Sequence, residues 1–429
     1  MRDLHADRSG VVRWGIAGLL VVASIVTTVV LYVLHPDALV TLLPSTDMRE
    51  LHVDFDTFWH SAVALTQGAD IYHTPAKLTN LNPPLLTVLL TPLTLFDSLT
   101  AYRIFAVLTL LIVVGAVLAV ARELRLHRGV TALALLAVLA SSPLHGTLVL
   151  GQIYPLLLAG LVAGWIAERH GRPVLAAVLF GVTVALKPSL APLLLLPAVQ
   201  RRWVPLWTGL GAAAAATVVG VLVAGPSSGF EWLRIAVTEP VPDTVDNASL
   251  PGLAVRFGVP SVLGTLLGAV VLVGTLMWCA RHRYRIDPAG TAPWAVLAAG
   301  LLVSPISWHN YLMLLWPGVL VLITLGRGAA AAAALSVIVI PVSWNADWPP
   351  EGFGPDVARS LYCAILIGYW AVLSRSVLLR SAPFEGSDAV GSGGPVSSDD
   401  SASPDDSATS DGSVKSAPLG ARSAHSSGS

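Results

Sequence analysis

Apolar runs long enough to cross a lipid bilayer follow one another through most of this chain, from Trp14 to Leu379. A helix needs about 20 apolar residues to cross the hydrocarbon core, and helices are expected because lipid offers backbone polar groups no hydrogen-bonding partner. The chain is 54% hydrophobic and 12% charged, whereas soluble domains carry about 25% charged residues. The sequence therefore excludes a soluble globular protein and predicts an all-α, polytopic transmembrane helical bundle.

Charged residues sort the joints between the apolar runs into two classes. Arginines cluster in alternate joints, for example around Arg122, Arg201 and Arg281, and acidic residues collect in the others. Because cytoplasmic loops are enriched in Lys and Arg, we predict that the basic joints and both termini are cytoplasmic, with about 12 spans (roughly 10–13). Residues 14–34 read as a retained first span and residues 85–96 as a re-entrant hairpin. The predicted spans are 14–34, 102–121, 130–149, 151–167, 173–187, 188–200, 203–224, 260–280, 291–306, 311–326, 328–343 and 358–379.

Composition changes abruptly near residue 382, which divides the chain into a transmembrane domain, 1–382, and a tail, 383–429. The tail is mostly Ser, Gly, Asp, Ala and Pro, and it holds seven acidic and two basic residues. Such a segment cannot bury enough apolar area to offset its ordering entropy, so we predict a disordered cytoplasmic tail. Without the tail, the formal charge changes from −1 to +4.

The first predicted outer loop, residues 35–84, contains the sequence HVDFDTFWH at positions 52–60. Acids and aromatic residues alternate there at near-helical spacing, which favours a short amphipathic helix at the membrane interface. A carboxylate within hydrogen-bonding reach can take a proton from a hydroxyl group. Residues two positions apart on a helix diverge by about 200°. We therefore expect Asp54 to be the catalytic carboxylate, with Asp56 as its substitute or supporting neighbour.

Lys187 lies within an otherwise apolar run, residues 174–196. A cation in the middle of the membrane costs about 2.5–3.5 kcal/mol on insertion scales, so an ionisable group there indicates function. Pro188 breaks the helix and lets the ammonium face a cavity, where a phosphate group would be a suitable partner. The alternative is a lysine that extends to the outer lipid headgroups.

Further polar residues fall on the same predicted outer face. His309 follows the sequence SPISW and can donate to a phosphate or orient an acid; the alternative is an interfacial aromatic belt. Arg256, in the second long outer loop, can bind a phosphate through two hydrogen bonds, or it is an ordinary solvated charge. Asn247 lies in that same loop, and Gln152 begins a predicted span.

Taken in order, these motifs resemble glycosyltransferase family 87 from about residue 50 to residue 320. The family contains actinobacterial polyprenyl-phosphate-mannose α-mannosyltransferases and related arabinofuranosyltransferases. One departure is Asn82, where the family usually has an aromatic residue before Pro-Pro. The residues that carry the resemblance are Asp54, Trp59, Gly68, Asp70, Tyr72, Pro83, Pro84, Gly151, Gln152, Gly181, Lys187, Pro188, Asn247, Ser249, Ser304, Ser307, Trp308 and His309.

The resemblance implies a GT-C fold with an outer active site and an inverting transfer that uses no metal and no cofactor. The family's first-loop aspartate, its Lys-Pro position and its Ser-Trp-His position fall on Asp54, Lys187 and His309. We expect Lys187, Arg256 and His309 to bind the donor phosphate. Candidates for sugar or acceptor binding are Trp59, Tyr72, Gln152 and Asn247, although interfacial anchoring is an equal alternative for the two aromatic residues.

The predicted function is that of a cell-membrane glycosyltransferase with Asp54 as general base. It would move a sugar from a polyprenyl-phosphate donor to a lipoglycan or cell-wall polysaccharide, and a mannosyl group is the first candidate for that sugar. Its partners would be these substrates and membrane lipids, with no nucleic acid. An arabinofuranosyltransferase of the same family is one alternative. A transporter or flippase is another, although such proteins place ionisable groups near the bilayer midplane rather than on one face.

Overall fold

The described part of the chain is built from helices. The computed structural model describes residues 2–37, 45–282, 290–342 and 352–377, and those residues contain no β-strand, only an isolated bridge between Asn247 and Trp308. The predicted tail, residues 383–429, lies outside them. The helices are α1 (Arg2–Leu34), α3 (Val53–Thr66), α4 (Pro84–Leu90), η1 (Thr91–Leu95), α5 (Ser98–Glu123), α6 (Arg128–Leu139), α7 (Ser142–Leu150), α8 (Tyr154–Arg169), α9 (Pro173–Leu186), η2 (Pro188–Leu195), α10 (Leu196–Val199), α11 (Trp203–Ala224), α12 (Pro226–Thr238), α13 (Leu250–Arg256), α14 (Ser261–Arg281), α15 (Ala292–Val303), η3 (His309–Leu315), α16 (Trp316–Thr324), α17 (Gly328–Val337), α18 (Phe353–Arg359) and α19 (Leu361–Ser376).

Each of the twelve predicted spans contains a helix, but few are long, straight crossings. Within the described residues, four helices are long and apolar enough to cross a membrane alone: Val11–Leu34, Ser98–Glu123, Trp203–Ala224 and Ser261–Arg281. Two bent pairs, α6 with α7 and α18 with α19, raise this number to six if each pair is one span. The structure thus supports a helical membrane protein with four to six such spans, and the number twelve stays a prediction.

Prolines explain why several apolar runs are broken. Lys187 ends α9 in an extended conformation, with φ −148° and ψ 91°, because the residue before a proline is disfavoured in the α region. The chain continues as the 3₁₀ helix η2, which contains Pro192. The predicted spans 173–187 and 188–200 are therefore two short helical pieces that meet at Lys187.

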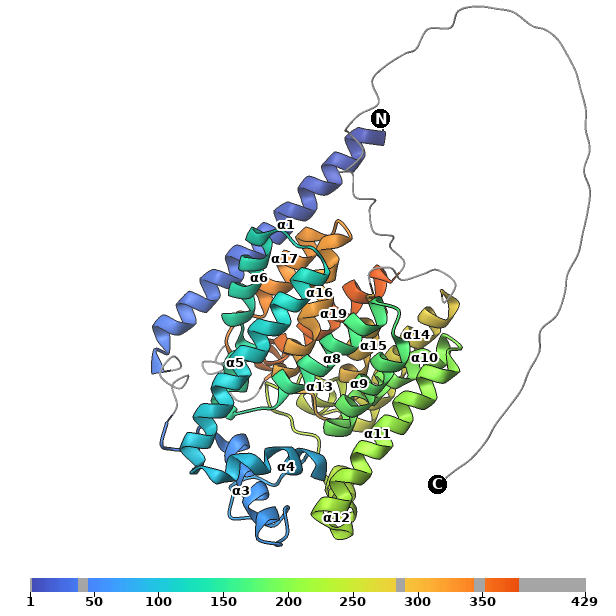
Figure 1. Ribbon diagram of the computed structural model, residues 1–429. Helices are drawn as coiled ribbons and strands as arrows, with labels where there is room; N and C mark the ends of the chain where they lie inside the picture. The colour runs from blue at the N-terminus through green and yellow to red at the C-terminus, as the bar shows by residue number, and fades with distance from the viewer. Residues whose placement is uncertain (1, 38–44, 283–289, 343–351, 378–429) are drawn as a thin grey trace, which may run out of the picture. The chain divides into compact units, whose positions relative to one another are not determined.

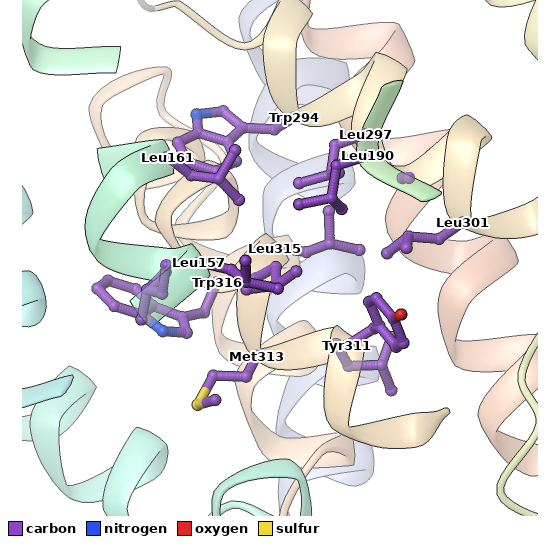
Figure 2. Packing of buried hydrophobic residues seen from close by; sticks show 14 of the residues in the cluster. Leu157, Leu161, Leu190, Trp294, Leu297, Leu301, Tyr311, Met313, Leu315 and Trp316 are labelled. Atoms are coloured by element: carbon purple, nitrogen blue, oxygen red, sulfur yellow. The ribbon is translucent and has the colours of Figure 1, made fainter. Parts of the chain in front are cut away.

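The core lies where these short helices meet. Figure 2 shows side chains from α8, η2, α15 and η3 packed together, among them Leu157, Leu190, Leu301 and Met313. Trp294 and Trp316 are fully buried in the same cluster. By contrast, the long helices α1, α11 and α14 expose many large apolar side chains. Such exposure suits contact with lipid chains, because these are as apolar as leucine itself.

Figure 1 shows how the elements are distributed along the bundle. α3, α4 and α12 lie at one end, and α1 runs beside α17. α11 runs from the neighbourhood of α10 to α12. Ion pairs between Arg169 and Glu123 and between Arg202 and Glu168 come from the basic joints after α5, α8 and α10. The acid-rich loop elements and the basic joints thus belong to different ends of the helices.

Small residues allow the closest helix contacts. A Cβ atom added to Gly181 in α9 would lie 2.3 Å from the carbonyl oxygen of Gly209 in α11. Close backbone approach at small residues is a general device of membrane helix pairs, because it maximises van der Waals contact. We conclude that Gly181 sets the spacing between α9 and α11.

We expect Gly181→Ala to lower stability by about 1–3 kcal/mol, because the added methyl group forces two packed backbones apart. The measurement is thermal unfolding of the detergent-solubilised protein. Gly211→Ala on α11 is the matched control, since a Cβ there meets no atom within 4 Å. Equal stability of the two variants would contradict this account of the contact.

Candidate active site

Asp54 lies in the first turn of α3, and the residue before that helix fixes its position. His52 is buried, and its ring stacks on Tyr102 with 3.8 Å between centroids. Its Nδ1–H donates to the Val149 carbonyl (2.7 Å), and its Nε2 accepts from the Ser45 N–H (3.0 Å). The imidazole therefore ties the start of α3 to the end of α7, and Asp54 is presented from an anchored helix terminus.

Gln152 is the direct partner of Asp54. Its amide Nε2–H donates to Asp54 Oδ2 over 2.6 Å. Gly151 makes this approach possible, because its φ of 76° is left-handed and a Cβ there would lie 2.4 Å from the Phe55 Cβ. Burial raises the pKa of Asp54 to about 6, while the Gln152 hydrogen bond and the charge of Lys187 oppose that rise and Asp246 adds to it. Such a carboxylate is basic enough to accept a proton near neutral pH.

Lys187 is held in position by a short series of polar contacts. Its ammonium donates to Asn82 Oδ1 over 2.9 Å and lies 6.0 Å from the centroid of the Tyr311 ring. Asn82 is buried, and its backbone carbonyl accepts from the Tyr72 hydroxyl (3.0 Å). Asn82, noted in the sequence only as a departure from the family pattern, is thus the partner of the cation.

Asp246 is a second carboxylate at this site, and sequence reasoning did not select it. It interacts electrostatically with Asp54, Tyr154 and His309. Its backbone carbonyl accepts from the His309 N–H over 2.6 Å. The acid-rich loop sequence around 243–249 was the available signal, but a loop carboxylate has no periodicity that shows where it points.

Asn247 and Arg256 hold the loop that carries Asp246. Asn247 is fully buried; its amide donates to the carbonyls of Pro242 and Pro305 and accepts from the N–H groups of Ser307 and Ser249. Arg256 donates to the carbonyls of residues 243, 244 and 247 and to the hydroxyl of residue 360. Both side chains thus direct these polar atoms at the protein and position the loop, and their predicted contacts with the sugar or acceptor and with the donor phosphate stay predictions.

His309 is buried at the start of η3, with its ring 5.0 Å from that of Tyr362. Neither ring nitrogen makes a well-formed hydrogen bond to a described residue, and the amide of Asn310 beside it is in the same state. Buried polar atoms without partners are rare and call for an explanation such as a ligand or a water molecule. His309 therefore keeps free hydrogen-bonding capacity next to Asp246.

The other predicted residues lie away from the Asp54 carboxylate. Asp56 is buried and pairs with His60 over 3.6 Å. Trp59 packs against a small cluster that contains Phe55 and Tyr102. Tyr72 is buried against α12 and uses its hydroxyl on Asn82. The structure thus links Gln152, Lys187 and Asp246 to Asp54, and His309 to Asp246, but it gives Asp56 and the two aromatic residues other neighbours.

Comparison with known protein families gives a match over about half of the chain. The model of glycosyltransferase family 87 matches residues 80–305. The chain belongs to glycosyltransferase family 87. It is accordingly a membrane glycosyltransferase, as the order of its motifs predicted.

The transferase has relatives of two kinds. It is 26% identical over 338 residues to an alpha-(1->3)-arabinofuranosyltransferase of Corynebacterium glutamicum, covering 71% of this chain and 75% of the relative. An enzyme of the same name in Mycolicibacterium smegmatis is 28% identical over 314 residues, 69% of this chain and 68% of the relative. A polyprenol-phosphate-mannose-dependent alpha-(1-2)-phosphatidylinositol mannoside mannosyltransferase of Mycobacterium tuberculosis is 26% identical over 297 residues, 62% and 68% of the two chains.

A cavity of about 460 Å³ lies elsewhere in the transferase, between α8, α9, α10 and α11. Trp165, Arg169 and Arg202 line it, and the set of lining residues includes none of the predicted site residues. The candidate site is therefore chosen by its polar groups and not by cavity volume.

The raised pKa of Asp54 gives stability a testable pH dependence. Because the folded-state pKa is about 6 and the unfolded value about 3.8, the contribution of Asp54 is present at low pH and is lost as pH rises through about 6. We expect Asp54→Asn to unfold at a higher temperature than the parent at about pH 7.5, with the difference vanishing near pH 4. Thermal unfolding across this pH range measures it.

Asp70→Asn is the control of opposite sign. Hydrogen bonds from the Tyr72 N–H and from His73 outweigh partial burial and lower the pKa of Asp70. Its charged form thus stabilises the folded state, so the asparagine variant should be the less stable one near neutral pH. The same sign for both variants would show that Asp54 is not a destabilising buried charge.

Proposed function

We propose that this transferase moves a glycosyl group from a polyprenyl phosphate to a hydroxyl group of a lipoglycan or cell-wall polysaccharide, with Asp54 as general base. The observation that carries the proposal is that Asp54, a carboxylate of raised pKa hydrogen-bonded to Gln152, interacts electrostatically with the Lys187 ammonium. A base and a cation so placed suit the two ends of a displacement at the anomeric carbon.

In the proposed step, Asp54 accepts the proton of the acceptor hydroxyl as its oxygen bonds to the anomeric carbon. The bond from that carbon to the phosphate oxygen breaks, and its electron pair leaves with the polyprenyl phosphate. Gln152 holds the carboxylate in place through its hydrogen bond. Asp54 must be ionised to accept the proton, so the step requires a pH above about 6.

Lys187 would compensate the charge that develops on the departing phosphate. Its hydrogen-bond partner, Asn82 Oδ1, is neutral, so an anionic phosphate would be a stronger partner for the ammonium than the amide is. His309 is the second candidate for the phosphate because its ring nitrogens make no well-formed hydrogen bond to a described residue. The contacts of Arg256 support an indirect contribution, through the loop that carries Asp246.

The proposed orientation places Asp54 outside the cell and both termini in the cytoplasm, with about 12 crossings in total as the charge pattern predicts. It is supported by α3 and α4 lying at one end of the bundle, away from the arginine-rich joints after α5, α8 and α10. A polyprenyl chain would then remain in the membrane while its phosphate reaches Lys187.

Two sugars suit the family: mannose, which we predicted first, and arabinofuranose. The arabinofuranosyltransferases match this chain over a longer stretch than the mannosyltransferases do. This difference supports an arabinofuranosyl donor, which is therefore the second candidate beside mannose. Incubating the purified enzyme with a glycan acceptor and a panel of radiolabelled polyprenyl-phosphate sugars separates the two. Movement of the donor across the membrane without transfer would instead support the transporter alternative.

Asp54→Asn should lower kcat by about 10²–10⁴-fold, because the amide cannot accept the acceptor's proton. Asp56→Asn is the matched control and should retain most of the activity, since Asp56 pairs with His60. In the parent, kcat should rise with pH through about 6, and Gln152→Leu should move this rise to higher pH because it removes a hydrogen bond that lowers the pKa. Full turnover by Asp54→Asn would exclude Asp54 as the base.

Lys187→Met should reduce kcat/KM roughly ten- to hundred-fold, in line with about 1.5–3 kcal/mol for a hydrogen bond to a charged group. Methionine keeps an unbranched apolar side chain, one heavy atom shorter than that of lysine, so folding should be preserved. Lys77→Met is the control, because Lys77 pairs with Glu50 on the surface. Steady-state kinetics with the donor varied would contradict the assignment if both variants behaved alike.

A further inference from the structure

Helix α12 has an unusual distribution of apolar side chains. It directly follows the long helix α11, from which Gly225 separates it with a φ of 90°. Ile235 is buried against Ile71 and Tyr72. Phe230 and Val237 are 76% and 77% exposed, and both lie on the opposite side of α12. The helix thus has one apolar face buried in the protein and a second one uncovered.

Helical geometry assigns the remaining residues to defined sides. At about 100° per residue, Phe230, Leu233 and Val237 fall within one sector of about 60°, nearly opposite Ile235. The polar residues Ser227, Glu231, Arg234 and Thr238 share one flank between the two apolar faces, where Glu231 and Arg234 form an ion pair. Apart from the buried Ser228, the polar side chains therefore point to one side, which gives the helix a definite flank for contact with water.

The uncovered face of α12 lies next to a surface that lipid must cover. α11 is one of the helices long and apolar enough to cross a membrane. In its last two turns Val219, Leu222 and Val223 are all more than half exposed. Because α12 starts at the end of α11 (Figure 1), the exposed apolar surface of one helix leads to that of the other.

We propose that α12 lies in the boundary between headgroups and acyl chains of the leaflet at this end of the bundle. Phe230, Leu233 and Val237 insert into the acyl region, and the flank with Glu231 and Arg234 faces water. An amphipathic helix in this setting binds through its buried apolar area. A lipid monolayer suits the surface better than a protein partner does, because α12 directly follows the end of α11, where exposed apolar side chains suit contact with lipid.

The position of α12 connects this lipid contact to the proposed active site. Ile235 packs on Tyr72, the Tyr72 hydroxyl donates to the Asn82 carbonyl, and Asn82 accepts from Lys187. This series of contacts is short, and Ile235, Tyr72 and Asn82 are buried. If the function proposed above holds, inserted α12 fixes the height of Lys187 relative to the headgroups from which a lipid-linked donor arrives.

Depth-dependent fluorescence quenching tests the insertion independently of any activity. Single cysteines at Phe230 and Val237, and at Ser227 and Thr238 as controls on the polar flank, are labelled with bimane in the full-length protein. Native Cys279 and Cys363 are buried, so they should react little, and the parent treated with bimane in the same way gives the background. The protein is reconstituted in phosphatidylcholine vesicles with a minority of phosphatidylglycerol and with lipids brominated high on the acyl chain.

Several-fold stronger quenching at Phe230→Cys and Val237→Cys than at Ser227→Cys and Thr238→Cys is the expected result. Equal, weak quenching at all four positions would overturn the proposal. A second result would also overturn it. If bimane at Phe230→Cys and Val237→Cys is as well shielded from iodide in concentrated detergent solution as in vesicles, and loses this shielding on dilution, a second copy of the protein covers the face.

The connection to the active site has its own test. The triple variant Phe230→Ser, Leu233→Ser, Val237→Ser should transfer sugar from a vesicle-embedded polyprenyl-phosphate donor several-fold more slowly than the parent. With a short-chain, water-soluble donor the two should be equal, since the interior of the site is unchanged. Equal loss with both donors would contradict a membrane-height role. A parent that transfers from neither donor would defeat the proposed function and leave the quenching result standing.

Discussion

The break at Lys187 is the constraint on which the arrangement of polar groups depends. Pro188 prevents α9 from continuing, so Lys187 lies at the end of the helix in an extended conformation and not within an apolar helical span. The short helical pieces that follow leave room for Tyr311 and Asn82 beside the cation. A cation in apolar surroundings is stable only with polar partners, and here those partners come from segments more than one hundred residues away in the chain.

Much of the fold could be predicted because apolar periodicity is a local property. Each predicted span contains a helix, and the single site carboxylate chosen from an i, i+2 pair is the one that meets Gln152. The number of complete crossings could not be obtained in this way. Proline breaks shorten helices such as α9 below the length of a bilayer, and hydropathy alone does not distinguish a broken crossing from a buried half-helix.

The roles of individual polar residues were harder to predict, because side-chain partners are set by tertiary contacts. Arg256 looked like a phosphate ligand, since its residue type is suited to that task, yet its guanidinium is used on backbone carbonyls of its own loop. Asn82 was noted only as a departure from the family pattern, and it is the hydrogen-bond partner of Lys187. Neither outcome has a local sequence signal, whereas a break before proline does.

The hydrogen bonds of Asn247 have a consequence for how such an enzyme can change. They join the loop before α13 to the loop before η3, and the backbone contact between Asp246 and His309 joins them again. The two loops must therefore shift as one solid piece. Adaptation to a differently shaped sugar would proceed less by exchanging a single contacting side chain than by tilting this double loop, through substitutions at its buried seam.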